Sequence, residues 1–257
     1  MEPNLIDETE TSKTLCQGVE EININSEESS DVNEEARTNG NEDSKVHGDE
    51  GIHEHDNRIT REDVTLPEDF EGKLAFVLRN VLTEKECKDY IKKTEKMGYT
   101  DALVNIGGGR QQMMKDVRNN TRCIWDSFEE ADNIWQRIKQ FIPDKWRNRE
   151  VMGLNERLRF LKYNPGEYFA PHMDGFYMRE NGERSFVTIQ LYLNQGFKGG
   201  STTFMCFEEL ERMEVVPETG MVLVFQHDIM HEGSALLEGR KYCMRTDIMY
   251  SATSANE

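Results

Sequence analysis

The pattern of hydrophobic and polar positions changes near residue 67. Residues 1–66 contain no Phe, Trp or Tyr, and they hold 19 Asp and Glu residues against five Lys and Arg residues. Such a segment cannot bury enough apolar surface to offset the entropy of ordering it. We therefore predict a disordered acidic tail over 1–66, which solubilises the chain or binds a partner. A folded domain over 67–252 and a flexible C-terminus over 253–257 follow it.

Two segments of the predicted domain carry helix signals. Residues 83–98 begin with Thr83 and Glu86 in the spacing of a capping box. Residues 127–142 begin with the same spacing, carry apolar residues along one side and end before Pro143. The sequence therefore predicts a helix over each of these segments.

Most of the remaining domain has a period of two, which is typical of strands. The segment LAFVLRNVL and the end of DVRNNTRCIW indicate strands before residue 157. After it come LRFLKY, YFAPHMD, SFVTIQLYL, TTFMCF, MVLVF and KYCMRTDIMY, separated by turn sequences rich in Gly, Asn and Pro. Because helices do not alternate with these strands, a doubly wound sheet is disfavoured. We predict a mainly β fold with supporting helices (α+β) and a double-stranded β-helix, or jelly-roll, core.

Charge and cysteine usage narrow the class of protein. The net charge of the chain is −18, and no basic stripe with interleaved aromatic residues is visible, so we expect no nucleic-acid partner. The five cysteines are scattered and form no CxxC pair, which favours a reducing compartment. The acidic start does not resemble a signal peptide, and no apolar run approaches a membrane span. We therefore expect a cytoplasmic or nuclear protein with no membrane partner.

The stretch YFAPHMDG places His172 two positions before Asp174. In a strand, residues i and i+2 point to the same face, so these two side chains would converge, together with Tyr168 and Ala170. A polar pair at the end of a strand would explain this spacing equally well. A second imidazole from elsewhere in the domain would complete a set of ligands that binds one face of Fe(II) and leaves three positions open. A structural zinc site would instead close all four positions, usually with thiolates.

The segment FQHDIMHEG offers His227 and His231 as the distal imidazole. Ten residues after His231 comes Lys241, at the start of the last predicted strand, and Arg245 lies on the same face of that strand. An oxygenase that uses 2-oxoglutarate needs a cation for the far carboxylate of this acid. Arginine would offer a bidentate fork and lysine a point charge, so both residues are candidates at this stage.

The segments YNPGEYFAPHMD, TIQLYLN, GGSTTF and HEGSALLEGRKY occur in this order in the chain. This set resembles the Fe(II)/2-oxoglutarate dioxygenases, most closely their prolyl 4-hydroxylase-like group, over about residues 73–250. The resemblance implies that the catalytic iron ligands are His172, Asp174 and His231. It implies that Lys241 is the cation for 2-oxoglutarate and that Tyr163 and Thr188 supply hydroxyl groups to it. His227 would lie outside the ligand set.

The resemblance implies an enzyme that hydroxylates a C–H bond and releases succinate and carbon dioxide. Its cofactor would be Fe(II), its co-substrate 2-oxoglutarate, and ascorbate is a candidate reductant as in related enzymes. Peptidyl proline is the best-known target of the group, and Arg118 and Asn120 match positions near its substrate pocket. An intracellular protein side chain and a small amino-acid-like molecule both stay open as substrates. Collagen is disfavoured, because the chain shows no signal peptide and no paired cysteines.

Two other classes of function are compatible with the sequence. A non-catalytic jelly-roll module could retain the ligand residues and bind a metal or a partner without turnover. An acidic interaction protein could carry its function in residues 1–66. Neither the substrate nor the oligomeric state follows from the residues.

Overall fold

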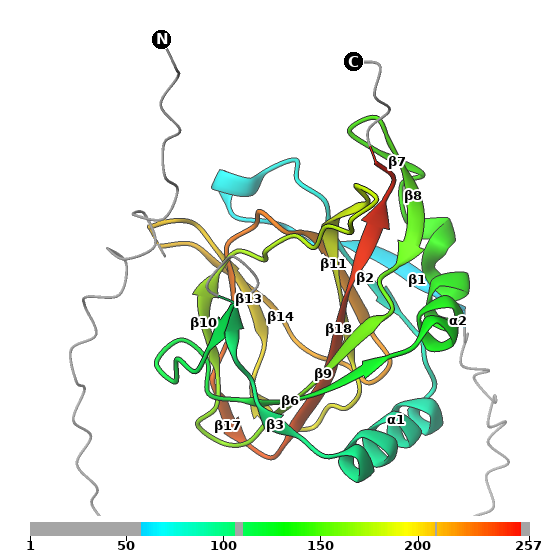
Figure 1. Cartoon of the computed structure of the whole chain (residues 1–257). Coiled ribbons are helices and arrows are strands. Elements are labelled where there is room, and N and C mark those ends of the chain that lie inside the picture. The colour runs from blue at the N-terminus through cyan, green and yellow to red at the C-terminus, as the bar shows by residue number, and fades with distance from the viewer. Residues whose placement is uncertain (1–57, 106–109, 209, 253–257) are drawn as a thin grey trace, which may run out of the picture. The chain divides into compact units, whose positions relative to one another are not determined.

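The computed structural model describes residues 58–105, 110–208 and 210–252 (Figure 1). Most of the predicted acidic tail and the predicted flexible C-terminus therefore lie outside the described residues. Strand β1 (Thr60–Asp63) is an exception, because it pairs antiparallel with β2 (Ala75–Arg79). The predicted boundary after residue 66 was thus too late. All four side chains of β1 are exposed, so this edge strand is held by backbone pairing and gives no apolar signal in the sequence.

The largest sheet has ten strands among the described residues and is antiparallel throughout. Its main path begins with β1 and β2. It continues through β15 (Val222–Gln226), β11 (Arg184–Tyr192), β18 (Lys241–Tyr250), β9 (Arg157–Tyr163), β6 (Thr121–Asp126) and β3 (Thr100–Asp101). Off this path, β8 (Arg149–Leu154) pairs with β18 and with β7 (Lys145–Trp146).

A second sheet of four strands runs in the order β10 (Phe169–His172), β16 (His231–Gly233), β13 (Thr202–Met205) and β14 (Arg212–Val215). Two short pairs complete the β structure, β12 (Lys198–Gly199) with β17 (Leu236–Glu238), and β4 (Val104–Asn105) with β5 (Gln111–Gln112). The smaller sheet lies across one face of the larger one (Figure 1). This arrangement confirms the predicted jelly-roll core.

Two helices pack against the large sheet on the side away from the smaller sheet (Figure 1). Helix α1 covers Glu84–Met97, and α2 covers Phe128–Ile138. The prediction of a helix up to residue 142 was too long, because the last turn of this segment is a 3-10 helix, η2 (Lys139–Phe141). A second 3-10 helix, η1 (Glu68–Phe70), precedes β2. Within the described part of the chain, no helix is long and apolar enough to cross a bilayer.

The hydrophobic core has two parts, one on each face of the large sheet. On the helix side, Ile134 and Ile138 of α2 are buried among residues of the sheet such as Phe160. Between the two sheets, Phe204 of β13 packs edge-on against Phe225 of β15 with ring centroids 5.3 Å apart. Burial on both faces fixes the register of the central strands, and it holds the inner face of the large sheet rigidly opposite the smaller sheet.

The predicted capping box of α1 is present, and it also joins α1 to α2. The backbone N–H of Thr83 donates to Glu86 Oε2 at 2.8 Å, and the N–H of Glu86 donates to Thr83 Oγ1 at 3.3 Å. Arg137 of α2 donates to Glu86 Oε1 at 2.6 Å. The Arg137 guanidinium, together with the hydrogen bonds from Thr83, outweighs burial and lowers the pKa of Glu86 from 4.5 to about 2.

We expect Glu86→Gln to lower the free energy of unfolding at pH 7 by about 1 kcal/mol, because the cap and a partly exposed ion pair are weakened together. Since the pKa of Glu86 is lower in the folded state, its stabilisation is complete above about pH 4.5 and is lost as the pH falls toward about 2. Urea unfolding at pH 7 and at low pH measures this. Glu84→Gln removes the same charge from the same turn, so an equal loss in that control would contradict the assigned role.

Candidate metal and co-substrate site

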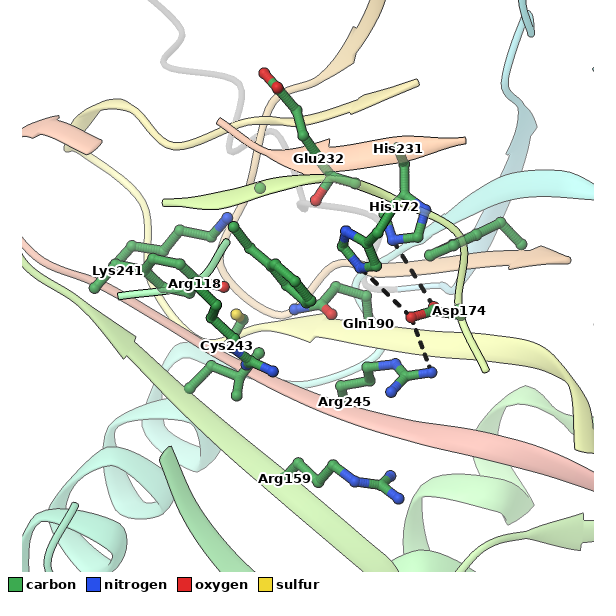
Figure 2. Close-up of a pocket in the computed structure, with 16 residues that line it drawn as sticks. Arg118, Arg159, His172, Asp174, Gln190, His231, Glu232, Lys241, Cys243 and Arg245 are labelled. Atoms are coloured by element: carbon green, nitrogen blue, oxygen red, sulfur yellow. Dashed lines mark ion pairs between the residues drawn. The ribbon is translucent and has the colours of Figure 1, made fainter. Parts of the chain in front are cut away.

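Three potential metal ligands meet between the two sheets. His172 at the end of β10 and His231 at the start of β16 are register partners, and Asp174 follows two residues after β10. One ligand atom from each of these residues lies within 4.8 Å of the others. Figure 2 shows the two imidazoles and the carboxylate pointing toward one another. The structure therefore brings together the three residues for which the sequence predicts a metal site.

Backbone carbonyls orient both imidazole rings. His172 Nδ1 lies 2.8 Å from the carbonyl oxygen of Ala170, and His231 Nδ1 lies 2.9 Å from that of Ile229. Since a carbonyl only accepts, each Nδ1 donates, and each Nε2 keeps its lone pair in the neutral ring. Burial, and then the proximity of His172, lowers the pKa of His231 to about 4, so this ring is neutral at pH 7. Both Nε2 atoms are therefore prepared to bind a metal ion.

The carboxylate of Asp174 is held by two donors. Thr188 Oγ1 donates to Asp174 Oδ2 at 2.6 Å, and Arg245 Nη2 lies 3.1 Å from Asp174 Oδ1. Burial alone would raise the pKa of Asp174, but Arg245 and the two histidines hold it well below its usual range. The backbone N–H of Asp174 also donates to the carbonyl of His227 at 2.9 Å. The ligand is thus ionised and fixed in orientation by its surroundings.

A chain of buried and half-buried charged side chains continues behind Asp174. Arg245 Nη2 lies 3.1 Å from Asp247 Oδ1, and Arg159 Nη1 lies 3.3 Å from Asp247 Oδ2. His227, for which the sequence predicts a position outside the ligand set, is buried with its Nε2 atom 3.5 Å from Asp247 Oδ1. Arg245 therefore serves two carboxylates, and its charge is compensated within the protein.

The other end of the same pocket contains a buried cation. Lys241 (Figure 2) and Tyr163 are register partners on β18 and β9, and both line the pocket. Lys241 Nζ donates to the carbonyl of Gly200 at 2.5 Å and lies 5.2 Å from the ring centroid of Tyr163. Among the described residues, Lys241 forms no ion pair with a carboxylate. Burial lowers its pKa, which is the cost of keeping this charge out of water.

Two glycines allow the chain to pass close to Lys241. Gly199 and Gly200 have φ angles of +70° and +69°, which L side chains rarely adopt. A Cβ atom on Gly199 would lie 2.4 Å from the carbonyl oxygen of Ala235, and one on Gly200 would lie 3.3 Å from Lys241 Cδ. These two glycines therefore place a carbonyl acceptor against the lysine.

Several residues lie differently from the sequence predictions. β10 ends at His172, so Asp174 reaches the site from a loop and not from the strand that the alternation predicted. Tyr168 and Ala170 do not line the pocket, and the Tyr168 hydroxyl instead donates to the carbonyl of Asp116 at 3.1 Å. Thr188 binds Asp174 directly. Of the two candidate cations on β18, Arg245 pairs with carboxylates, whereas Lys241 has no carboxylate partner in the part of the chain that the structure describes.

Other residues of the pocket gave no recognisable signal in the sequence. Thr202 lines the pocket and shares a 2.7 Å hydrogen bond with Tyr192, which is fully buried outside the lining and has its ring centroid 5.6 Å from Lys241 Nζ. Gln190 and Cys243 also line the pocket. Their alternation with outward-facing positions marks them as inward-facing, but only the position of the neighbouring strands shows that they face a polar pocket.

Comparisons with known proteins agree with this geometry. Residues 158–246 match the family model of the 2OG-Fe(II) oxygenase superfamily, and this range contains the three ligands, Tyr163 and Lys241. Prolyl 4-hydroxylase 2 of Arabidopsis thaliana is 25% identical over 205 residues, which cover 65% of this chain and 64% of that protein. Probable prolyl 4-hydroxylase 3 of the same plant is 29% identical over 133 residues, covering 51% and 45%. The chain thus spans less than two thirds of the length of these relatives.

Solved structures show the same fold. The viral collagen prolyl hydroxylase of Paramecium Bursaria Chlorella virus-1, in its 2OG complex, superposes with a TM-score of 0.52 at 19% identity, covering 70% of this chain and 98% of that one. A Pseudomonas putida prolyl-4-hydroxylase superposes with a TM-score of 0.50 at 16% identity, covering 70% and 95%. The comparisons confirm the resemblance to the 2OG-Fe(II) oxygenases and to their prolyl 4-hydroxylase-like group.

Proposed function

We propose that this chain, which resembles the 2OG-Fe(II) oxygenases of the prolyl 4-hydroxylase-like group, is a 2-oxoglutarate-dependent hydroxylase. It would hydroxylate a C–H bond, with peptidyl proline as the first candidate, and release succinate and carbon dioxide. The observation that carries this proposal is the presence, in one pocket, of the His172, Asp174 and His231 ligand set together with Lys241, whose charge has no carboxylate partner among the described residues. The curated relatives, whose names are prolyl 4-hydroxylases, support it.

The residues present fit Fe(II). Two imidazole Nε2 atoms and one carboxylate are the donor set that suits iron in oxygenases and leaves positions open for other ligands. The metal would supply dioxygen activation and the oxidation of the C–H bond. The chain supplies the orientation: carbonyls fix the two rings, and Thr188 and Arg245 fix the carboxylate of Asp174. Ascorbate is our proposed reductant for sustained turnover, as in related enzymes.

Lys241 would hold the far carboxylate of 2-oxoglutarate, and Tyr163 would donate its hydroxyl to the same group. Lys241 suits this role because its charge has one carbonyl partner and no carboxylate among the described residues. Arg245 suits it less, because Asp174 and Asp247 already compensate its charge. A dianionic co-substrate would give the buried lysine the partner that it lacks. Burial of this end of the pocket would also keep water away from the ion pair.

An anaerobic titration of the purified protein with Fe(II) and 2-oxoglutarate tests this function. We expect the weak visible charge-transfer band of an iron-chelated keto acid. His231→Ala should abolish the band, because it removes a ligand. His227→Gln should preserve it, because His227 lies outside the ligand set. A folded, iron-loaded protein without the band would contradict the proposal and favour a non-catalytic binding module.

The cell compartment and the substrate are part of the same proposal. We propose a cytoplasmic or nuclear enzyme that acts on a protein side chain or on an amino-acid-like molecule, without a nucleic-acid or membrane partner. The scattered cysteines support a reducing compartment. The cysteines of the described residues are all free, and Cys87, Cys123 and Cys243 are buried.

A further inference from the structure

Several arginines gather where the pocket meets the neighbouring strands β6 and β9. Arg159 and Leu161 of β9 both line the pocket, and Figure 2 shows Arg159 below Arg245. Their register partners on β6 are Ile124 and Arg122 respectively. Because partners in an antiparallel pair project to the same face of a sheet, Arg122 and Ile124 extend the pocket lining along β6.

Most charged side chains around the pocket and on the neighbouring strands form ion pairs. The ion pairs are Arg245 with Asp174, Arg159 with Asp247, Arg157 with Asp126 and Arg212 with Glu232.

Arg118 and Arg122 differ from these arginines, because their polar contacts are with neutral groups. Arg118 Nε donates to Asn120 Oδ1 at 2.7 Å, and Arg122 Nη2 donates to Gln111 Oε1 at 2.7 Å. Within the described ranges, neither arginine forms an ion pair.

The surroundings of the two arginines also destabilise their charged forms. Burial first, and then the nearby charges of Arg118, Arg159 and Arg157, lowers the pKa of Arg122. Burial likewise lowers the pKa of Arg118, whose guanidinium lies 4.5 Å from the ring centroid of Phe169. In a chain of net charge −18, two half-buried arginines without an acidic partner among the described residues form a local excess of positive charge. Fe(II) and the 2-oxoglutarate dianion carry opposite charges of equal size. Binding of both would therefore leave this excess of positive charge unchanged.

We propose that Arg118 and Arg122 bind carboxylate side chains of the substrate, which is a peptide segment with Asp or Glu residues near the oxidised position. This inference rests on the proposed function and names its substrate class. The guanidinium fork matches a carboxylate in a bidentate geometry, and partial burial strengthens the pair. Electrostatic complementarity of this kind steers a charged partner into a cleft and sets its register.

The shape of the surface favours a peptide over other anions. Arg122 and Ile124 lie two positions apart on one face of β6, a spacing that matches alternate side chains of an extended peptide. Ile124 is 39% exposed and offers an apolar contact beside the cation. A nucleic acid would need a larger cluster of cations than Arg118 and Arg122, and the net charge of the chain would repel it. A short acidic peptide needs only the two.

The test is the binding of two fluorescein-labelled peptides to the full chain, loaded anaerobically with Fe(II) and 2-oxoglutarate. One peptide contains a proline flanked by Asp and Glu, and the other carries Asn and Gln at those positions. By fluorescence anisotropy at low salt, we expect the acidic peptide to bind about tenfold more tightly. The preference should fall toward unity in Arg122→Gln and in Arg118→Gln, and it should weaken near 0.15 M salt.

Arg79→Gln is the matched control. It removes the same charge, but Arg79 lies on β2 at the opposite end of the large sheet and pairs with Glu62 and Glu218. The preference for the acidic peptide should persist in this variant. Equal binding of the two peptides would overturn the proposal, and so would a preference that survives the double change of Arg118 and Arg122.

This binding measurement is independent of turnover. If the charge-transfer band is absent but the acidic preference is present and depends on Arg122, the enzyme assignment fails while the docking surface stands. If the band is present but both peptides bind equally, the enzyme assignment stands and the substrate class is wrong.

Discussion

Replacing Asp174 with alanine should abolish the conversion of 2-oxoglutarate to succinate while the fold is retained. The variant loses the one anionic ligand of the site and leaves two imidazoles that are half-buried or buried. Changes to the outer partners of metal ligands already cost about 10- to 100-fold in affinity or activity, so loss of the ligand itself should exceed about 100-fold. Succinate release, measured with saturating Fe(II), checks the activity.

The structure also predicts a limited cost in stability for this variant. Removing one partner of a buried ion pair costs about 3–5 kcal/mol when the other charge is left uncompensated. Here Arg245 keeps Asp247 at 3.1 Å as a second acidic partner. We therefore expect a loss of about 1–3 kcal/mol in the free energy of unfolding, with an unchanged far-UV circular dichroism spectrum.

Asp174→Asn separates the charge of the residue from its shape. The amide keeps the shape and can accept from Thr188, but it lacks the negative charge that binds a metal and compensates Arg245. It should lose turnover as fully as the alanine variant. Substantial turnover in either variant, in protein shown to be folded, would refute the assignment of Asp174 as a ligand.

The parts of the structure that follow from local sequence were predictable, and the capping box of α1 shows why. Thr83 and Glu86 interact with each other across three positions, so their chemistry is contained in one segment. The metal site was predictable for a related reason, since the spacing of His172 and Asp174 and the small number of histidines outside the acidic segment limit the possible sets. The resemblance to a known family then selected His231.

The remaining features depend on which strands become neighbours. Lys241 and Arg245 project from one face of β18 and are equivalent in the sequence. Their partners differ because their neighbouring strands differ. β11 places Thr188, which binds Asp174, opposite Asp247, so Arg245 meets two carboxylates. Lys241 lies opposite Tyr163 of β9. Strand β14 is not among the predicted strands, although its four residues alternate between exposed polar and inward-facing apolar side chains. The loop position of Asp174 likewise depends on a hydrogen bond to His227, far away in sequence.

Lys241→Met should raise the KM for 2-oxoglutarate by about 100-fold and, at the same time, increase the stability of the metal-free protein. Methionine keeps an unbranched stem of similar length but removes the charge that would pair with the co-substrate. A hydrogen bond to a charged group contributes about 1.5–3 kcal/mol, which corresponds to about 10- to 100-fold in affinity. The stability should rise because the buried ammonium has a carbonyl partner but no carboxylate among the described residues.

Arg245→Met is the matched comparison on the same strand, and the opposite stability change is expected. It removes the arginine partner of Asp174 and leaves Arg159 as the arginine partner of Asp247, so the free energy of unfolding should fall. Its effect on turnover should appear through metal binding, with a smaller change in the KM for 2-oxoglutarate at saturating Fe(II). Kinetics of succinate release and thermal unfolding of both variants decide between the two cations. A large rise in this KM for Arg245→Met, together with an unchanged value for Lys241→Met, would reverse the assignment. We expect the buried charge of Lys241 to lower the stability of the protein and to raise its affinity for 2-oxoglutarate. This is the trade-off between stability and activity that is typical of functional sites.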